Sequence, residues 1–117
     1  YGWKAGEAHR WFNDRCQTNI LNFDKPKRND VHPSMKAVEM LVYLVKNSSA
    51  RGDTVLDNFG GSGSTLVACE QTGRKCRMME LDPRYCDVIR RRWAEFVHGE
   101  GCDWQSLTPL AEEGGEE

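Results

Sequence analysis

The strongest constraint on this chain is a run of small residues, Gly60 to Gly63 (G-G-S-G), that separates an apolar stretch from a helical one. Glycine adopts positive φ angles without steric cost, so the run predicts a tight turn. The apolar residues before it, Thr54 to Phe59, predict a short strand. After the turn we expect a helix that begins at Ser64 or Thr65 and ends near Gly73, a residue suited to a helix C-terminus.

A second strand and a long helix follow this turn. Cys76 to Leu81 has the apolar character of a strand, and Arg84 to Val97 has the periodicity of an amphipathic helix. Strand, glycine turn, helix and strand form the opening of a doubly wound nucleotide-binding fold. The predicted fold class is therefore α/β, a partial Rossmann-like (doubly wound) fold with few strands. One face of the long helix carries its apolar side chains: Tyr85, Val88, Ile89, Trp93 and Phe96.

The sequence divides into three stretches by composition. Residues 1–33 form an aromatic and polar segment that we expect to continue from an upstream part, with residues 20–23 as its best strand candidate. Residues 34–100 form the α/β region, which we expect to open with a helix from Ser34 to about Asn47. Residues 101–117 are rich in Glu and Gly, and we expect them to be a disordered acidic tail. Apolar side chains at i, i+3, i+4 and i+7 support the first helix: Val38, Leu41, Val42 and Val45.

Composition limits the classes of protein that this chain belongs to. With 117 residues, 38% of them hydrophobic and 29% charged, it suits one domain with a modest core. Residues 40–45 are the longest apolar stretch, which is far too short to cross a bilayer, so we expect no membrane partner. Five cysteines without a Cys-x-x-Cys pair argue against a disulfide framework and a zinc ribbon. We therefore expect reduced thiols, no metal and a cytoplasmic location.

Three interpretations of the glycine turn compete. A phosphate-binding P-loop needs Gly-Lys-Ser/Thr, and no lysine follows Gly63. The dinucleotide motif G-x-G-x-x-G needs a third glycine where this chain has Leu66, which disfavours a nicotinamide enzyme. A plain structural turn capped by Asp57 is the third interpretation, and composition alone leaves it open.

Two acidic residues flank the turn and favour a different ligand. Glu80 lies roughly 20 residues beyond Gly61, the spacing at which an acid receives ribose hydroxyls in this fold. Asp57 precedes the turn and suits a ligand that carries an ammonium group better than it suits a phosphate. S-adenosylmethionine has a ribose, an ammonium and a carboxylate, and the positive end of the following helix can face the carboxylate.

Three segments resemble motifs of the N4-cytosine/N6-adenine DNA methyltransferases. Residues 57–65 (D-N-F-G-G-S-G-S-T) resemble the cofactor motif D-P-F-x-G-S-G-T-T of that family. Residues 32–36 (H-P-S-M-K) resemble H-P-T-x-K-P, and residues 80–85 (E-L-D-P-R-Y) resemble E-x-D-P-x-Y. Their order is that of the permuted beta group, and the opening of the chain resembles phage and prophage members. Asn58 and Ala37 stand where the family has proline, which removes rigidity but no functional group.

The resemblance implies S-adenosylmethionine as the cofactor and a set of residues that bind it. Asp57 and Phe59 would line the methionine and adenosine moieties, together with the three turn residues Gly61, Ser62 and Gly63. Glu80 would hold the ribose, and Asp82 would lie near the adenine. His32 and Lys36 would approach the methionine end, although Lys36 is equally compatible with an exposed lysine in a first helical turn.

The catalytic motif of the same family, D/N/S-P-P-Y/F/W, is missing from the sequence. The chain has four prolines, and no two of them are adjacent. Residues 82–85 (D-P-R-Y) match three of its four letters but fit the cofactor segment that follows Glu80. We therefore assign no catalytic residue, and we expect the chain alone to be inactive. An N-terminal truncation would explain both the missing motif and the shortage of strands.

The predicted function is thus part of an S-adenosylmethionine-dependent DNA methyltransferase that acts on an exocyclic amino group. We expect N6 of adenine as the target, a restriction-modification setting, and a bacterial or phage-infected cell. Double-stranded DNA is the expected partner of the complete enzyme. The alternative is a non-catalytic or split-enzyme binding module that needs a partner, either a second copy in a homodimer or a second chain with the catalytic motif.

Overall fold

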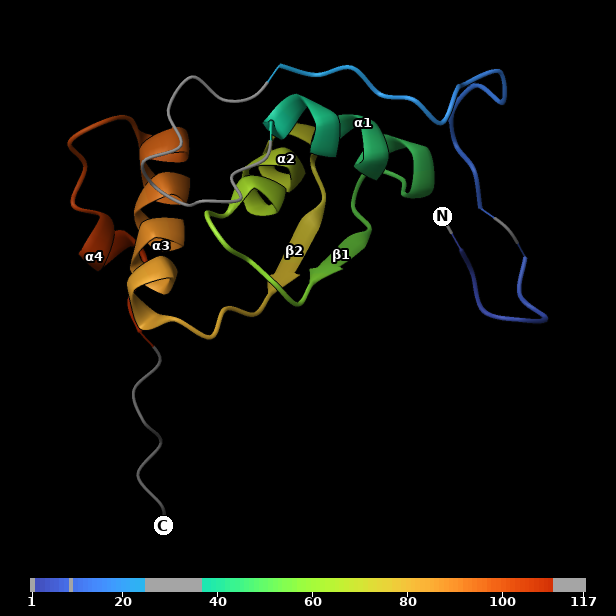
Figure 1. Cartoon of the computed structure of the whole chain (residues 1–117). Coiled ribbons are helices and arrows are strands. Elements are labelled where there is room, and N and C mark those ends of the chain that lie inside the picture. The colour runs from blue at the N-terminus through green and yellow to red at the C-terminus, as the bar shows by residue number, and fades with distance from the viewer. Residues whose placement is uncertain (1, 9, 25–36, 111–117) are drawn as a thin grey trace, which may run out of the picture.

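A βαβ unit forms the centre of the computed structural model, which describes residues 2–8, 10–24 and 37–110. Strands β1 (Thr54–Asp57) and β2 (Lys75–Met78) pair in parallel, with Thr54 opposite Lys75 and Asp57 opposite Met78. Helix α2 (Ser64–Thr72) is the crossover between them (Figure 1). The predicted order of strand, glycine turn, helix and strand is confirmed. Each strand is shorter than expected, because pairing stops where the chain bends into the loops that follow Asp57 and Met78.

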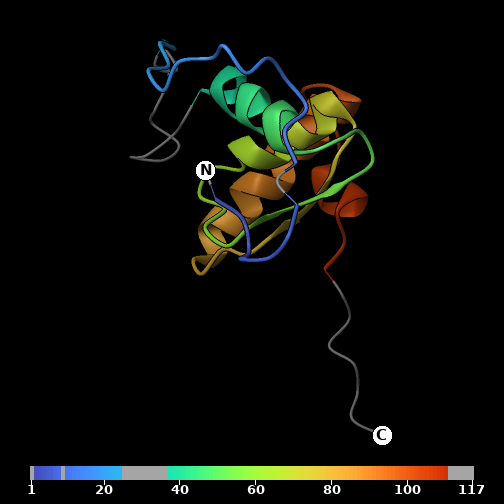
Figure 2. The same cartoon turned by 90° about the vertical axis from the view of Figure 1, so that its right-hand side faces the viewer.

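Helix α2 is the most buried element. Val67, Ala68 and Cys69 leave at most 5% of their surface exposed. The helix lies between α1 (Val38–Ser48) and α3 (Pro83–His98), as Figure 2 shows, and it contacts both. It ends at Gly73, whose φ of 71° lets its N–H reach the carbonyls of the last turn. The predicted end of this helix is therefore confirmed.

Helix α1 begins later than its sequence pattern predicts. Its first residue is Val38, preceded by Ala37 in an extended conformation, and it ends at Ser48. Ser34, the expected cap, lies outside the described residues.

Helix α3 starts as predicted, but its apolar face is only partly buried. Asp82 caps it through the backbone N–H of Arg84. Ile89 and Ala94 are its buried residues, whereas Phe96, expected on the buried face, is 46% exposed. Near Arg90, whose guanidinium lies over the Trp104 ring, α3 packs against a short helix, α4 (Trp104–Leu107), which the sequence did not predict. Residues 101–110, assigned to the tail, are therefore structured in part.

The expected strand at residues 20–23 is not formed. A strand needs a hydrogen-bonding partner, and this segment lies along α1 instead (Figure 1). Asn47, which is 3% exposed, accepts from the side-chain amides of Asn13 at 2.8 Å and Gln17 at 3.1 Å. The backbone carbonyl of Asn47 also accepts a hydrogen bond from the backbone N–H of Phe12 at 2.9 Å. The N-terminal segment is thus held by the side chain and the backbone carbonyl of a helix residue rather than by a strand edge. The domain division itself stays a prediction.

The two faces of the sheet differ in exposure. Residues that point to the helices are half-buried, and those on the outer face are exposed. The largest apolar group on the outer face is Leu56, whose surface is 66% exposed. Exposed side chains on this face are Thr54, Leu56, Lys75 and Arg77.

The five cysteines are free thiols. Cys69 on α2 and Cys76 on β2 lie side by side, and burial raises the pKa of both, that of Cys76 to about 12. Both thiols are therefore protonated at neutral pH and poorly nucleophilic. Among the described residues, no helix is both long enough and apolar enough to span a membrane.

Candidate cofactor-binding site

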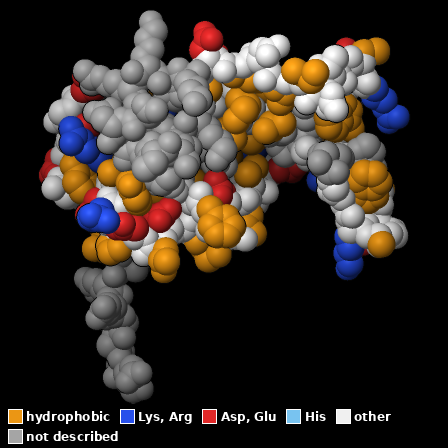
Figure 3. All heavy atoms as spheres, viewed as in Figure 1, with side chains coloured by type: hydrophobic (Ala, Val, Ile, Leu, Met, Phe, Trp, Pro, Cys, Tyr) orange, Lys and Arg blue, Asp and Glu red, His pale blue; other side chains and the backbone are white. Residues whose placement is uncertain are grey.

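A cleft of about 420 Å³ lies beyond the carboxyl ends of β1 and β2. Doubly wound folds bind ligands in this position, and the volume lies in the usual range for small-molecule sites. Figure 3 shows hydrophobic side chains at the lower edge of the body, where the two strands end in Figure 1. The cleft is lined by residues 57–62, 64, 65, 80 and 81 and by Leu41 of α1.

Asp57, the last residue of β1, connects the two ends of the turn. Its Oδ1 accepts from the backbone N–H of Phe59 at 2.9 Å, and its Oδ2 accepts from the hydroxyl of Thr65 at 2.7 Å. A carboxylate offers about four lone-pair positions, so these two bonds leave it able to accept from a ligand. Thr65 was not among the predicted site residues, although it is the last residue of the D-N-F-G-G-S-G-S-T motif.

Glu80, which follows β2, accepts hydrogen bonds that connect it to the glycine turn. Its Oε2 accepts from the backbone N–H of Gly61 at 2.6 Å, and its Oε1 accepts from the backbone N–H of Asp82 at 3.1 Å. The structure therefore brings Asp57, Gly61 and Glu80 together in one cleft, as the sequence predicted. Glu80 also fixes the position of the turn, a role that its spacing from Gly61 did not reveal.

The glycines of the turn are required for two different reasons. Gly61 and Gly63 have φ angles of 58° and 82°, which side chains disfavour. A Cβ atom on Gly60 would lie 2.7 Å from the Cγ and Sδ atoms of Met78, so a side chain at this position would force the Met78 side chain to shift. At Gly63 both effects apply: its φ angle is positive, and a Cβ atom there would lie 3.2 Å from Ile89 Cγ1.

Comparison with known proteins identifies the family. The model of a DNA methylase family, of the N6/N4 type, matches residues 4–91. The chain belongs to this DNA methylase family. The resemblance inferred from the motifs is thereby confirmed, whereas the permuted order and the likeness to phage members stay predictions.

Several curated Type II methyltransferases resemble part of this methylase chain. M.BamHI of Bacillus amyloliquefaciens is 41% identical over 56 residues, which are 48% of this chain and 13% of that protein. M.MthZI of Methanothermobacter thermautotrophicus is 30% identical over 83% of this chain and 27% of its own length. The methylase chain therefore spans about a quarter or less of these relatives.

Solved structures of similar proteins share the fold. TTHA0409 of Thermus thermophilus, in complex with S-adenosyl-L-methionine, is 41% identical with a TM-score of 0.51, over 54% of this chain and 26% of that one. The M1.HpyAVI–SAM complex is 25% identical with a TM-score of 0.60, over 71% of this chain and 43% of that one. The Rossmann-like class predicted for the methylase is thus confirmed.

The other predicted site residues occupy different positions. Phe59 stands at the rim of the cleft with 90% of its surface exposed. Gly63 is buried at the N-terminus of α2 and does not line the cleft. Asp82 caps α3 and pairs with Arg84 at 2.8 Å, and the hydrogen bonds from Arg84 hold the pKa of Asp82 below its ordinary value. His32 and Lys36 lie outside the described residues.

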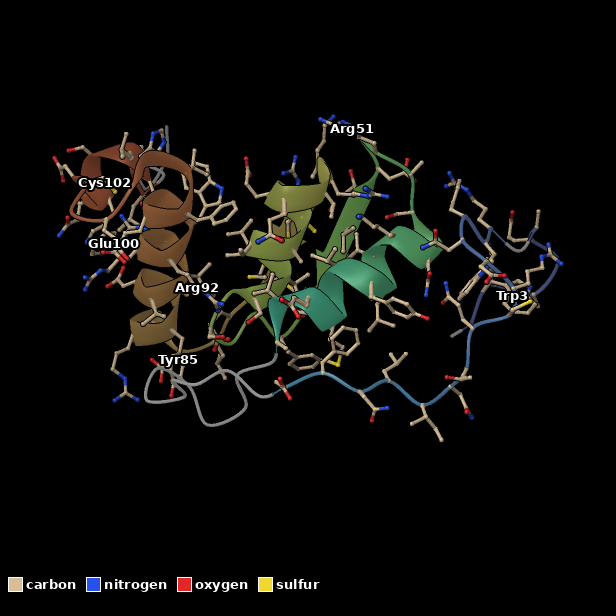
Figure 4. The ribbon with its side chains drawn as sticks, turned by 90° about the horizontal axis from the view of Figure 1, so that it is seen from above. Trp3, Arg51, Tyr85, Arg92, Glu100 and Cys102 are labelled. Carbon is tan, nitrogen blue, oxygen red and sulfur yellow. The ribbon has the colours of Figure 1, made fainter. Side chains whose placement is uncertain are left out.

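Arg92 of α3 supports the turn from behind the cleft. Its Nη1 donates to the carbonyl of Ser62 at 3.0 Å and to the hydroxyls of Ser62 at 3.1 Å and Ser64 at 3.0 Å. Figure 4 shows the side chain reaching from α3 to the turn. In the sequence, Arg92 is one of three consecutive arginines, and no local signal marks it as the one that faces the site. Within the part of the methylase that the structure describes, no group of His, Cys, Asp and Glu is suited to a metal ion.

Proposed function

We propose that this chain binds S-adenosylmethionine in the cleft beyond β1 and β2, as the cofactor-binding part of a DNA amino-methyltransferase. The observation that carries the proposal is the pair of carboxylates, Asp57 and Glu80, on either side of a glycine turn in one cleft. The cofactor supplies an electrophilic methyl group when it is bound. The chain's own residues bind and orient it.

The donor and acceptor groups of the cleft fit this ligand. Glu80 suits the ribose, because a carboxylate accepts hydrogen bonds from two vicinal hydroxyls. Asp57 suits the ammonium of the methionine moiety, to which it offers a charge-assisted hydrogen bond. Phe59 presents an exposed ring at the rim, where it would contact the adenosine. The relatives that are solved with S-adenosylmethionine add support from the family.

We propose duplex DNA as the substrate of the complete enzyme, N6 of adenine as the methyl acceptor, and the cytoplasm of a bacterium or phage-infected cell as the place of action. The Type II methyltransferase relatives support a restriction-modification role. His32, Lys36 and Asp82 remain proposed contacts of the cofactor. Nucleoside analysis of DNA treated with the complete enzyme would distinguish N6-methyladenine from N4-methylcytosine.

Replacing either carboxylate is expected to weaken cofactor binding. Each of Glu80→Gln and Asp57→Asn should cost about 1.5–3 kcal/mol of binding free energy, roughly tenfold or more in affinity, because each removes a charge-assisted contact. Calorimetric titration with S-adenosylhomocysteine measures the effect. The matched control is Glu100→Gln, which changes an exposed carboxylate beyond α3 and should leave the affinity unchanged. Equal affinities in all four proteins would exclude this cleft as the site.

A second candidate is a binding module that works only with a partner, and the exposed outer face of the sheet favours it. We expect a dimer mass in light scattering at high protein concentration, because pairing would cover Leu56, which is 66% exposed. Leu56→Lys should restore a monomer mass. Leu110→Lys changes a 74% exposed residue after α4 and is the control. A monomer mass for the wild type at every concentration would exclude self-association.

A further inference from the structure

Asp57 is a half-buried carboxylate that forms no ion pair with the described residues. Other aspartates of this part of the chain pair with arginines: Asp53, Asp82 and Asp87. Asp57 accepts instead from two neutral donors, the backbone N–H of Phe59 at 2.9 Å and the hydroxyl of Thr65 at 2.7 Å. Its negative charge is therefore available to a cationic group of a ligand in the cleft that it lines.

The partial charge of α2 balances the Asp57 carboxylate only in part. Thr65 lies in the first turn of this helix, which contains no acidic residue. The N-terminus of a helix carries roughly half a positive charge, against the full negative charge of a carboxylate. Two hydrogen bonds also leave about two of the four lone-pair positions of the carboxylate open. The carboxylate thus keeps both charge and acceptor positions for a ligand that supplies a cation.

Thr65 fixes the direction in which the Asp57 carboxylate points. Asp57 is the last residue of β1 and Thr65 is the second residue of α2, and the glycine turn connects the two elements (Figure 1). The backbone N–H of Phe59 holds Oδ1, and the Thr65 hydroxyl holds Oδ2. Since each oxygen has its own donor, rotation of the carboxylate about the Cβ–Cγ bond would break both hydrogen bonds. A ligand then meets a carboxylate that is already oriented, and less rotamer freedom is lost when the ligand binds.

We propose that Thr65 is a positioning residue, which holds the Asp57 carboxylate for the ammonium group of the bound cofactor. Thr65 thereby makes the site selective for ligands that carry the amine of the methionine moiety. The Thr65 hydroxyl donates its hydrogen to Asp57, so it acts on the ligand through that carboxylate. The inference rests on the proposed binding of S-adenosylmethionine, and it adds the residue that orients one of the two carboxylates of the cleft.

The test compares two ligands that differ only in the ammonium group. S-adenosylhomocysteine has the ammonium, and its deaminated analogue keeps the adenosine and the carboxylate without it. Thr65→Val removes the hydroxyl at nearly the same side-chain shape, Thr65→Ala removes it with less bulk, and Thr65→Ser keeps it. Thr54→Val is the matched control, because Thr54 is an exposed threonine of β1 outside the cleft. Each full-length variant is titrated with both ligands by calorimetry, after thermal melting has shown that it is folded.

We expect Thr65→Val and Thr65→Ala to weaken the binding of S-adenosylhomocysteine about fivefold, and that of the deaminated analogue less than about twofold. Thr65→Ser and Thr54→Val should bind both ligands as the wild type does. In a protein that already carries Asp57→Asn, Thr65→Val should weaken the binding of S-adenosylhomocysteine by less than about twofold, because the carboxylate that Thr65 positions is gone.

Three results would overturn the inference while cofactor binding stands. Equal weakening of both ligands would show that Thr65 only shapes the turn. Unchanged or higher affinities in Thr65→Val and Thr65→Ala would show that Asp57 is held without the hydroxyl. A full loss of affinity from Thr65→Val in the Asp57→Asn protein would show that Thr65 contacts the ligand directly. Failure of the wild type to bind S-adenosylhomocysteine overturns the proposed function and this inference together.

Discussion

The 117-residue chain, supplied with S-adenosylmethionine and duplex DNA, is expected to transfer no methyl groups above background. Transfer requires the amine to lie in line with the sulfonium and close to its methyl group. An exocyclic amine becomes accessible only when its base is extruded and held, by hydrogen bonds and by stacking on aromatic side chains. The family motif that holds the base needs two adjacent prolines, and none of the four prolines here are adjacent. Without that placement, the reaction forgoes roughly 7–11 kcal/mol of activation free energy.

A tritium-transfer assay on DNA of mixed sequence measures this activity. The informative controls are Asp82→Ala and Tyr85→Ala, because residues 82–85 are the nearest match to the catalytic motif. In the structure Asp82 caps α3 and Pro83 opens it, a role in helix initiation. Methylation by the wild type that both substitutions abolish would make this tetrapeptide catalytic and our assignment wrong. Activity that appears only when a second chain with D-P-P-Y is added would support the split-enzyme alternative.

Gly63→Ala is expected to destabilise the fold by about 2–5 kcal/mol. A left-handed conformation costs a residue with a side chain about 1–2 kcal/mol, and overpacking in a core costs about 1–3 kcal/mol. Both penalties apply to Gly63, which has a φ of 82° and would place its Cβ 3.2 Å from Ile89 Cγ1. Because small domains have only about 5–15 kcal/mol of stability, this is a large fraction of the total. Urea denaturation followed by circular dichroism gives the free energy of unfolding.

Gly52→Ala is the matched control for that measurement. Gly52 has a φ of 89°, and a Cβ there would meet no atom within 4 Å. Its substitution should cost only the conformational part, about 1–2 kcal/mol, and it lies outside the cleft. The difference between the two variants isolates the contact with Ile89. Equal losses would show that α3 does not limit the space available to the turn.

The sequence predicted those features that depend on neighbours along the chain. The turn at residues 60–63, the strands on either side of α2 and the end of that helix at Gly73 all follow from local composition. Asp57 and Glu80 were also assigned to one ligand, from the spacing between Gly61 and Glu80 that is typical of this fold. The turn, the presence of the two strands and the helix end are properties of short stretches, although the fold shortens both strands.

Features that depend on distant neighbours were missed. The space requirement at Gly60 comes from Met78 and Ile89, which reach it only in the folded state. Arg92 contacts Ser62 across 30 residues, and nothing in a run of three arginines distinguishes the one that turns inward. Residues 20–23 have the composition of a strand, but Phe23 packs against Tyr43 of α1 with ring centroids 6.1 Å apart. Helix α4 forms where it packs on α3. Local propensity predicts secondary structure poorly where tertiary contacts determine it.

The cleft draws nearly all of its lining from residues 57–65 and 80–81, which a single crossover separates. Contacts between residues this near in sequence form only small loops, and forming a small loop costs the chain little entropy. Low contact order also goes with fast folding. During synthesis, the pocket is therefore expected to assemble early, once β2 has paired with β1 and α3 has packed against the turn through Arg92. A ligand that binds it at that stage would stabilise the folding intermediate by mass action, and the cofactor would then assist the biogenesis of the enzyme that uses it.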